Sequence, residues 1–331
     1  MNGRPYVAGR VLFAAALVFE GGLCAAPVVR TNLFFTGFER LEGFDPQFVL
    51  ATQNGWLDYA ELNGNSVPDL LSTGLSTNVF AGLGQQGWIG GAYVDKAVDS
   101  VSVWHPLIID PVPTATPIVK FSVLLAIEEA PVGKFDFFRW SIYNSQTNRL
   151  FSIDFENQNQ TIAYQGDDGV FHDVPTQFVP DTIHHLEVAI HFAANQWNAW
   201  LDGEQMVTNA PVTTTNMRRT LGEIDAVWLP SDANNRTDRL MYFDNFKLSA
   251  ESVPTPPMPP TLLTLGRTTN GFYALRLLGE NDARYVLDYS ANATTWTPIK
   301  TNIAVDGAFD YVDTNAPIVP ERLFRARLLS E

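Results

Sequence analysis

Hydrophobic and polar residues alternate along much of the chain with the two-residue period of a β-strand. In residues 183–192 (IHHLEVAIHF), Leu186 and Val188 fall on one side while His185 and Glu187 fall on the other, which predicts a strand with one buried face. Similar alternation predicts strands at 135–143, 150–156, 161–165 and 196–201. No long apolar stripe with helical spacing occurs, so the pattern predicts an all-β protein.

Polar turn sequences separate these segments. Asp202-Gly203 is a strong β-hairpin signal, because glycine adopts the positive φ that a tight turn requires. Residues 144–148 and 157–160, which are rich in Asn and Gln, connect further strands, and a proline cluster at 106–117 is interpreted as a loop. Short strands joined by polar turns at this spacing favour a β-sandwich.

A proline-rich stretch divides the chain into two parts. The sequence VPTPPMPP at 253–260 supports neither a sheet ladder nor a helix, so residues 251–261 are interpreted as a linker. It separates a first domain, residues 27–250, from a tail, residues 262–331, in which shorter strands and turn glycines predict a second, smaller sandwich.

The first 26 residues have the features of an export signal. Arg4 and Arg10 form a positively charged segment before a run of apolar residues at 11–19, and small residues follow at 25–26. A run of this length suits a signal peptide and is too short for the ~20 residues of a transmembrane helix. Cleavage would remove Cys24, the only cysteine. We therefore expect a bacterial protein, secreted or held at the cell envelope, with no membrane span after cleavage.

Composition and net charge restrict the kinds of partner that this chain is expected to bind. The chain is 46% hydrophobic, which is enough for packed cores, and its formal net charge is −15. No cluster of Lys and Arg could neutralise a phosphate backbone, so we expect no nucleic-acid partner.

Two segments carry a resemblance to a known superfamily. The strand Thr182-Ile183-His184-His185-Leu186-Glu187-Val188, followed by Trp197-Asn198-Ala199-Trp200-Leu201-Asp202-Gly203, resembles the strand and hairpin of laminin-G-like domains. These domains belong to the concanavalin A-like lectin/glucanase superfamily. The resemblance implies a jelly-roll β-sandwich for residues 27–250. The family usually has tryptophan where this chain has Thr182, and the fold alone does not settle function.

The tail resembles a short C-terminal module of secreted bacterial proteins. The matching stretches are Phe272–Leu277, Tyr285–Ser290, Trp296–Pro298 and Leu323–Ala326. The predicted fold class is therefore all-β, a jelly-roll β-sandwich followed by a small Ig-like β-sandwich.

One predicted strand carries candidate catalytic residues. In residues 151–156, the side chains of Ser152, Asp154 and Glu156 share the face opposite the apolar residues. Jelly-roll hydrolases of the laminarinase type have Glu-x-Asp-x-Glu here, with one glutamate as nucleophile and the other as acid/base. Ser152 replaces the first glutamate. We therefore expect a polar face without hydrolase activity, and keep Asp154 and Glu156 as catalytic residues of an alternative, a glycoside hydrolase or polysaccharide lyase.

The same face is the candidate ligand site. Arg139 and Tyr143 are expected beside Asp154 and Glu156, and Tyr164 is expected to join them from the next strand, which would combine aromatic and hydrogen-bonding groups.

The resemblance also implies a structural calcium ion. Glu39 and Asp244 occupy places on the first and last strands where related jelly rolls supply carboxylate ligands. The alternative is that both are ordinary edge residues.

These observations predict a secreted, non-catalytic recognition protein, whose jelly-roll domain binds an extracellular glycan or cell-surface component and so serves carbohydrate binding or cell adhesion. The alternatives are the hydrolase or lyase and a structural envelope protein.

Overall fold

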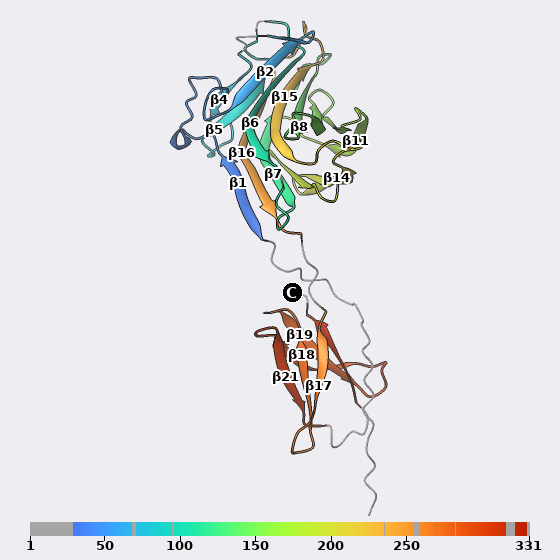
Figure 1. Ribbon diagram of the computed structural model, residues 1–331. Coiled ribbons are helices and arrows are strands. Elements are labelled where there is room, and N and C mark those ends of the chain that lie inside the picture. The colour runs from blue at the N-terminus through green and yellow to red at the C-terminus, as the bar shows by residue number, and fades with distance from the viewer. Residues whose placement is uncertain are drawn as a thin grey trace, which may run out of the picture. The chain divides into compact units, whose positions relative to one another are not determined.

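The computed structural model describes residues 29–67, 71–94, 96–110, 112–234, 236–253, 259–281, 283–315 and 322–329. They form two compact units, which divide after Val253 (Figure 1). The predicted signal peptide, residues 1–26, and residues 254–258 of the predicted linker lie outside the described residues. No α-helix occurs in the described part of the chain, which has one short 3-10 turn, η1 (Arg40–Glu42), and no helix able to cross a bilayer. The all-β prediction is confirmed.

The N-terminal unit is a jelly-roll sandwich of two antiparallel, eight-stranded sheets. Sheet A has the spatial order β14 (Glu204–Pro211), β13 (Gln196–Leu201), β12 (His184–His191), β7 (Ile118–Ile127), β16 (Leu240–Glu251), β5 (Gln85–Gly90) and β4 (Thr73–Thr77), and β1 (Arg30–Thr36) also pairs with β16. Sheet B has the order β11 (Phe171–Gln177), β10 (Thr161–Gly166), β9 (Arg149–Glu156), β8 (Asp136–Tyr143), β15 (Leu221–Pro230), β6 (Ser100–Ile109), β2 (Leu57–Leu62) and β3 (Asn65–Ser66).

The alternation read from the sequence is present in the strands. In β12, Leu186 and Val188 are fully buried, while His185 is exposed. The hairpin between β13 and β14 turns at Asp202 and Gly203, whose φ values of 52° and 83° are those of a tight primed turn. The predicted hairpin is confirmed.

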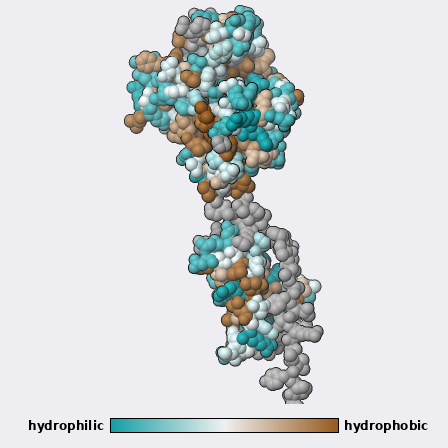
Figure 2. All heavy atoms as spheres, in the orientation of Figure 1, coloured by the Kyte–Doolittle hydropathy of each residue, from teal (hydrophilic) through white to brown (hydrophobic). Residues whose placement is uncertain are grey.

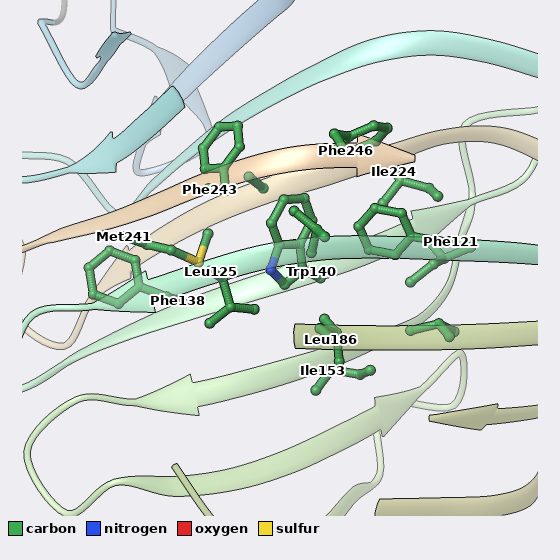
Figure 3. Packing of buried hydrophobic residues seen from close by; sticks show 14 of the residues in the cluster. Phe121, Leu125, Phe138, Trp140, Ile153, Leu186, Ile224, Met241, Phe243 and Phe246 are labelled. Atoms are coloured by element: carbon green, nitrogen blue, oxygen red, sulfur yellow. The ribbon is translucent and has the colours of Figure 1, made fainter. Parts of the chain in front are cut away.

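Aromatic side chains from both sheets fill the core. Trp140 of β8 lies 5.2 Å from Phe121 of β7 and 5.6 Å from Phe243 of β16, measured between ring centroids. Figure 3 shows Trp140 among these rings, with Ile153 and Leu186 nearby. Because Trp140 and its neighbours are fully buried, the inner face of β8 is fixed by packing, and the orientation of its other face follows.

The proline cluster at 106–117 is not wholly a loop, because β6 continues through Pro106 to Ile109. Pro106 lies opposite Glu223 of β15, whereas the pairing of β6 with β2 ends at Trp104. At Pro106, therefore, β6 has a strand neighbour on one side only, and the absent N–H of proline is tolerated there.

A carboxylate joins the β10–β11 turn to the loop that leads into β15. Asp167 accepts hydrogen bonds from the hydroxyl groups of Thr213, Thr214 and Thr215, and from the backbone N–H groups of the last two. Burial alone would raise the pKa of Asp167, but these bonds outweigh it and hold the pKa below its ordinary value.

We expect Asp167→Asn to lower the free energy of unfolding by about 1–2 kcal/mol at pH 7, because the amide cannot accept as many of these bonds. A depressed pKa stabilises the fold above the unfolded-state pKa and loses this effect as the pH falls, so the difference should shrink towards pH 3 in urea unfolding. Asp168→Asn, in the same turn, is the control and should change little. Equal effects of the two variants would contradict this role.

The C-terminal unit is a small sandwich of two three-stranded sheets. One has the order β17 (Thr261–Arg267), β18 (Tyr273–Leu278) and β21 (Ala308–Asp313); the other has β20 (Thr297–Ile303), β19 (Arg284–Ser290) and β22 (Leu323–Leu328). Leu277 and Phe309 from the first pack with Tyr285 from the second. Its Ig-like assignment stays a prediction. On the face shown in Figure 2, exposed hydrophobic residues occur in several small groups on both units.

Candidate functional site

Four neighbouring strands of sheet B place polar residues in register on the face that points away from the core. In β9, Phe151, Ile153 and Phe155 belong to the core, so Ser152 and Asp154 point outwards. One row runs across β9, β8, β15 and β6 through Ser152, Ser141, Asp225 and Trp104. The adjacent row runs through Asp154, Arg139, Val227 and Ser102. These two rows, with the flanking Tyr143, Arg149 and Glu223, are called the outer face of sheet B.

This face is closely packed although no sheet lies over it. Ser152, Asp154 and Asp225 are 0%, 3% and 4% exposed. The Ser152 hydroxyl and one oxygen of Asp225, Oδ1, have no hydrogen-bond partner among the described residues. Buried polar atoms are ordinarily hydrogen-bonded, so these two atoms are unsatisfied, but both are enclosed by their neighbours rather than open to solvent.

Arg139 and Asp154 form a buried, bidentate ion pair. Arg139 Nε donates to Asp154 Oδ1 at 2.7 Å, and Nη2 donates to Oδ2 at 2.6 Å. The two side chains are 11% and 3% exposed. Both carboxylate oxygens of Asp154 are therefore held by one guanidinium group, a geometry that orients Arg139 and fixes the centre of the face.

Arg149 lies at the edge of the face with a neutral partner. Its Nη2 donates to Gln165 Oε1, and no carboxylate within the described ranges forms an ion pair with it. Burial, together with the nearby charge of Arg139, lowers the pKa of Arg149. The guanidinium remains charged and retains N–H groups that can donate.

Asp225 is the most perturbed acid of the face. Burial, reinforced by the charge of Glu223 two residues earlier on the same strand, raises the pKa of Asp225 to about 8. Burial also raises the pKa of the Tyr143 hydroxyl, and the charge of Asp225 raises it further. At neutral pH, Asp225 is mainly a neutral carboxyl group and Tyr143 a neutral phenol, so both can donate a hydrogen bond.

Asp225, Glu223 and Arg149 were not among the site residues predicted from the sequence. The sequence does indicate a shared face for the two acids: in residues 221–228 (LGEIDAVW), Glu223 and Asp225 alternate with the apolar Ile224 and Ala226. What the alternation does not reveal is that β15 lies beside β8, because strands 8 and 15 are far apart in the chain.

Glu156 is on the outward side of β9, but its carboxylate belongs to the following turn. It accepts hydrogen bonds from the backbone N–H groups of Gln158 and Asn159 and from the Asn159 side chain. The role of Glu156 in ligand binding or catalysis stays a prediction; in this structure its acceptor oxygens satisfy the β9–β10 turn.

Tyr164 faces the opposite side of the sheet from the other predicted ligand residues. It lies opposite Ile153 in the register of β10 and β9, and its ring packs edge-on against Trp197 at 5.3 Å between centroids. The prediction that Tyr164 joins the polar face is wrong. Tyr164 lies two residues after the core residue Ile162 on the same strand, so both side chains point to the same face.

Glu39 and Asp244 lie close together, as the calcium prediction requires. A Cβ atom built on Gly37 would lie 3.7 Å from Asp244 Oδ1 and 3.8 Å from both Glu39 Cγ and Glu42 Oε1. Burial raises the pKa of Asp244 to about 6; hydrogen bonds from Asn245 and Gln86 oppose this, and the charges of Glu39 and Glu42 reinforce it.

The fit of this cluster to a cation is partial. Carboxylate oxygens around the small Gly37 suit calcium, and a cation would relieve their repulsion. Within the described residues, however, no three Asp, Glu, His or Cys side chains already converge as a metal centre. Backbone carbonyl groups would have to complete the coordination.

Comparison with known proteins identifies no family. No family model matches the chain, and no curated protein matches it. Among solved structures, the chain is similar to the CBM2 module of an evolved Dit of Lactobacillus casei BL23 phage J-1, with 10% identity over 70% of this chain and 100% of that one at a TM-score of 0.44.

It is also similar to the carbohydrate recognition domain of Emp46p, with 9% identity over 59% of this chain and 88% of that one at a TM-score of 0.37. A sialidase is 10% identical over 59% of this chain at a TM-score of 0.37, and the match spans only 17% of the sialidase. Two of these three are carbohydrate-binding domains by name. Similarity at this level assigns neither a family nor an activity.

Proposed function

We propose that the protein is a secreted recognition protein whose jelly-roll domain binds a glycan on the outer face of sheet B, in carbohydrate binding or cell adhesion. The observation that carries this proposal is the row of polar side chains in register, Ser152, Ser141 and Asp225, which ends at the partly exposed ring of Trp104. Ser152 Oγ and Asp225 Oδ1 have no partner among the described residues but are enclosed by their neighbours, so a ligand would satisfy them after displacing the side chains over them.

Aromatic side chains beside these atoms favour a sugar. Trp104, directly opposite Asp225, is partly exposed, and Tyr59, on the neighbouring β2, is 42% exposed. Specific small-molecule sites combine apolar platforms with a few placed polar groups. A sugar ring has an apolar face and a rim of hydroxyl groups, which matches Trp104 next to Asp225 and Ser152.

The carboxylates favour binding over hydrolysis. Asp154 is held at both oxygens by Arg139, and Glu156 by its turn, so neither is free to act as a nucleophile. One feature favours the alternative hydrolase or lyase: burial raises the pKa of Asp225 to about 8, which suits a general acid.

A glycan array of the full chain, with Trp104→Ala and Phe48→Ala beside the wild type, tests the proposal. We expect saturable wild-type binding to one sugar class and at least a tenfold loss in Trp104→Ala, because the aromatic platform is removed. Phe48, 62% exposed outside sheet B, is the matched control and should leave binding unchanged. A blank array for a folded protein would contradict glycan binding and favour a structural envelope role, while release of shortened sugars would favour the hydrolase or lyase.

The proposed location rests on the N-terminal sequence. A cleavable signal at residues 1–26 implies a bacterial protein that is secreted or held at the cell envelope. Expression with its own N-terminus in a bacterial host, followed by sequencing of the exported protein, should give a mature chain that begins near Pro27. A full-length protein in the cytoplasm would contradict this.

We also propose that Glu39 and Asp244 hold a structural calcium ion. Calcium that binds only the folded state stabilises it by about 2.7 kcal/mol at a concentration of 100 times the Kd. We therefore expect the melting temperature of the N-terminal unit to be several degrees higher in calcium than in chelator. Glu39→Gln should abolish this difference, and Glu129→Gln, at an exposed site, should retain it. Equal melting temperatures with calcium and chelator would contradict the proposal.

A further inference from the structure

Arg149 is a charged group that lacks the counter-ion its surroundings call for. It is partly buried, and its hydrogen bond is to the neutral amide of Gln165. The charge of Asp154 acts on Arg149 from a distance, but both oxygens of that carboxylate are bound by Arg139. Charged groups withdrawn from water are ordinarily paired, because their desolvation is otherwise uncompensated. An anionic group supplied from outside would complete this arrangement.

Ser152 and Asp225 add hydrogen-bond donors to the face, whereas Glu223 at its edge is an acceptor. The hydroxyl of Ser152 has no partner in the described structure. Asp225 is 4% exposed, receives no hydrogen bond from a cation, and has Glu223 as a neighbour on its own strand. A carboxyl group in that setting keeps its proton and donates, in agreement with the rise in its pKa.

We propose that the outer face of sheet B binds the carboxylate of an acidic sugar, so that the recognised glycan contains uronic acid residues. This inference rests on the proposed glycan-binding function and names the ligand class. Arg149 provides the charged contact with the sugar carboxylate, and Asp225, in its neutral form, donates a hydrogen bond to an oxygen of the same glycan.

The charged groups around Asp225 predict how this binding depends on pH. Glu223 lies two residues before Asp225 on the same strand, β15. Arg139 and Tyr143 lie beside Asp225 on β8, and its neighbour on β6, Trp104, has no titratable group. Loss of the Asp225 proton removes a donor and adds negative charge beside Glu223. Binding of an acidic glycan should therefore weaken above about pH 8.

The test compares acidic glycans with uncharged versions of the same chain. The full chain is titrated calorimetrically at pH 7 with tetramers of galacturonate, β-1,4-glucuronate and mannuronate, and with the methyl ester of each. We expect at least one tetramer to bind, and its ester to bind at least tenfold more weakly, because the ester has lost the charge that Arg149 recognises.

Variants assign the preference to these residues. Arg149→Gln should weaken binding of the acidic tetramer at least tenfold, so that acid and ester bind almost equally, and Arg149→Lys, which keeps the charge, should retain part of the preference. Lys300→Gln removes one exposed positive charge from the C-terminal unit and is the control. Asp225→Asn keeps a donor but cannot ionise, so its affinity should hold at pH 9.5 where the wild type loses at least tenfold.

The outcomes separate this inference from the proposed function. Equal binding of acid and ester, or binding of neutral array sugars with none of the three uronates, overturns the acidic ligand and leaves glycan binding standing. Retention of the preference in Arg149→Gln also overturns it. The absence of binding to any glycan, acidic or neutral, contradicts the proposed function itself.

Discussion

Replacement of Arg139 by methionine is expected to destabilise the N-terminal unit by about 3–5 kcal/mol, because it leaves Asp154 buried without a counter-ion. Asp154 is 3% exposed and has both oxygens on Arg139. The free energy of unfolding in urea at pH 7 measures this effect. Arg139→Met with Asp154→Leu removes both charges and should recover most of the loss, since no unpaired ion remains.

The C-terminal unit provides a matched control for this prediction. Arg276 and Asp310 form a bidentate pair at 2.6 and 2.7 Å, nearly the same geometry, but the side chains are 46% and 51% exposed. Exposed pairs contribute little because water screens their charges, so Arg276→Met should have a small effect on the transition of its own unit. Equal losses in Arg139→Met and Arg276→Met would show that burial does not set the strength of the first pair.

Asp225 should make the protein less stable as the pH rises through neutrality. Its pKa is about 8 in the folded protein and near 3.8 in the unfolded chain, so between these values the folded state binds the extra proton. The free energy of unfolding then falls as the pH rises between these values and levels off above about pH 9, where the folded state has also lost the proton. Over pH 6 to 8 the loss is on the order of 2 kcal/mol, because the slope of about 1.4 kcal/mol per unit halves as the pH reaches the folded-state pKa.

Asp225→Asn should remove this part of the pH dependence. The window from pH 6 to 8 is chosen because Asp244, with a pKa of about 6, contributes mainly below it. Urea unfolding at several pH values should show a falling stability for the wild type and a nearly constant one for Asp225→Asn. Parallel curves for the two proteins would mean that Asp225 is already ionised at pH 6.

Strand pattern and turn chemistry allowed much of the fold to be predicted. The alternation in 183–192 gave β12 within one residue at each end, and Asp202-Gly203 gave the hairpin. These features depend on residues that are neighbours in the chain, so they are visible without knowledge of the partner strands.

The candidate site was only partly predictable, because it depends on residues that are far apart in the chain. Arg139 and Asp154 lie on adjacent strands joined by a short turn, and their shared face follows from alternation. Asp225 is brought beside them by the pairing of β8 with β15, which links residues about eighty positions apart. Tyr164 was assigned to the wrong face although its spacing from Ile162 gave the correct one.

Hydrogen–deuterium exchange would locate a bound glycan directly. The full chain is compared with and without the oligosaccharide that gives the strongest array signal. We expect slower exchange in residues 136–143, 149–156 and 221–230 of sheet B and no change in residues 184–201 of sheet A. Protection confined to sheet A or to the C-terminal unit would contradict a glycan site on the outer face of sheet B.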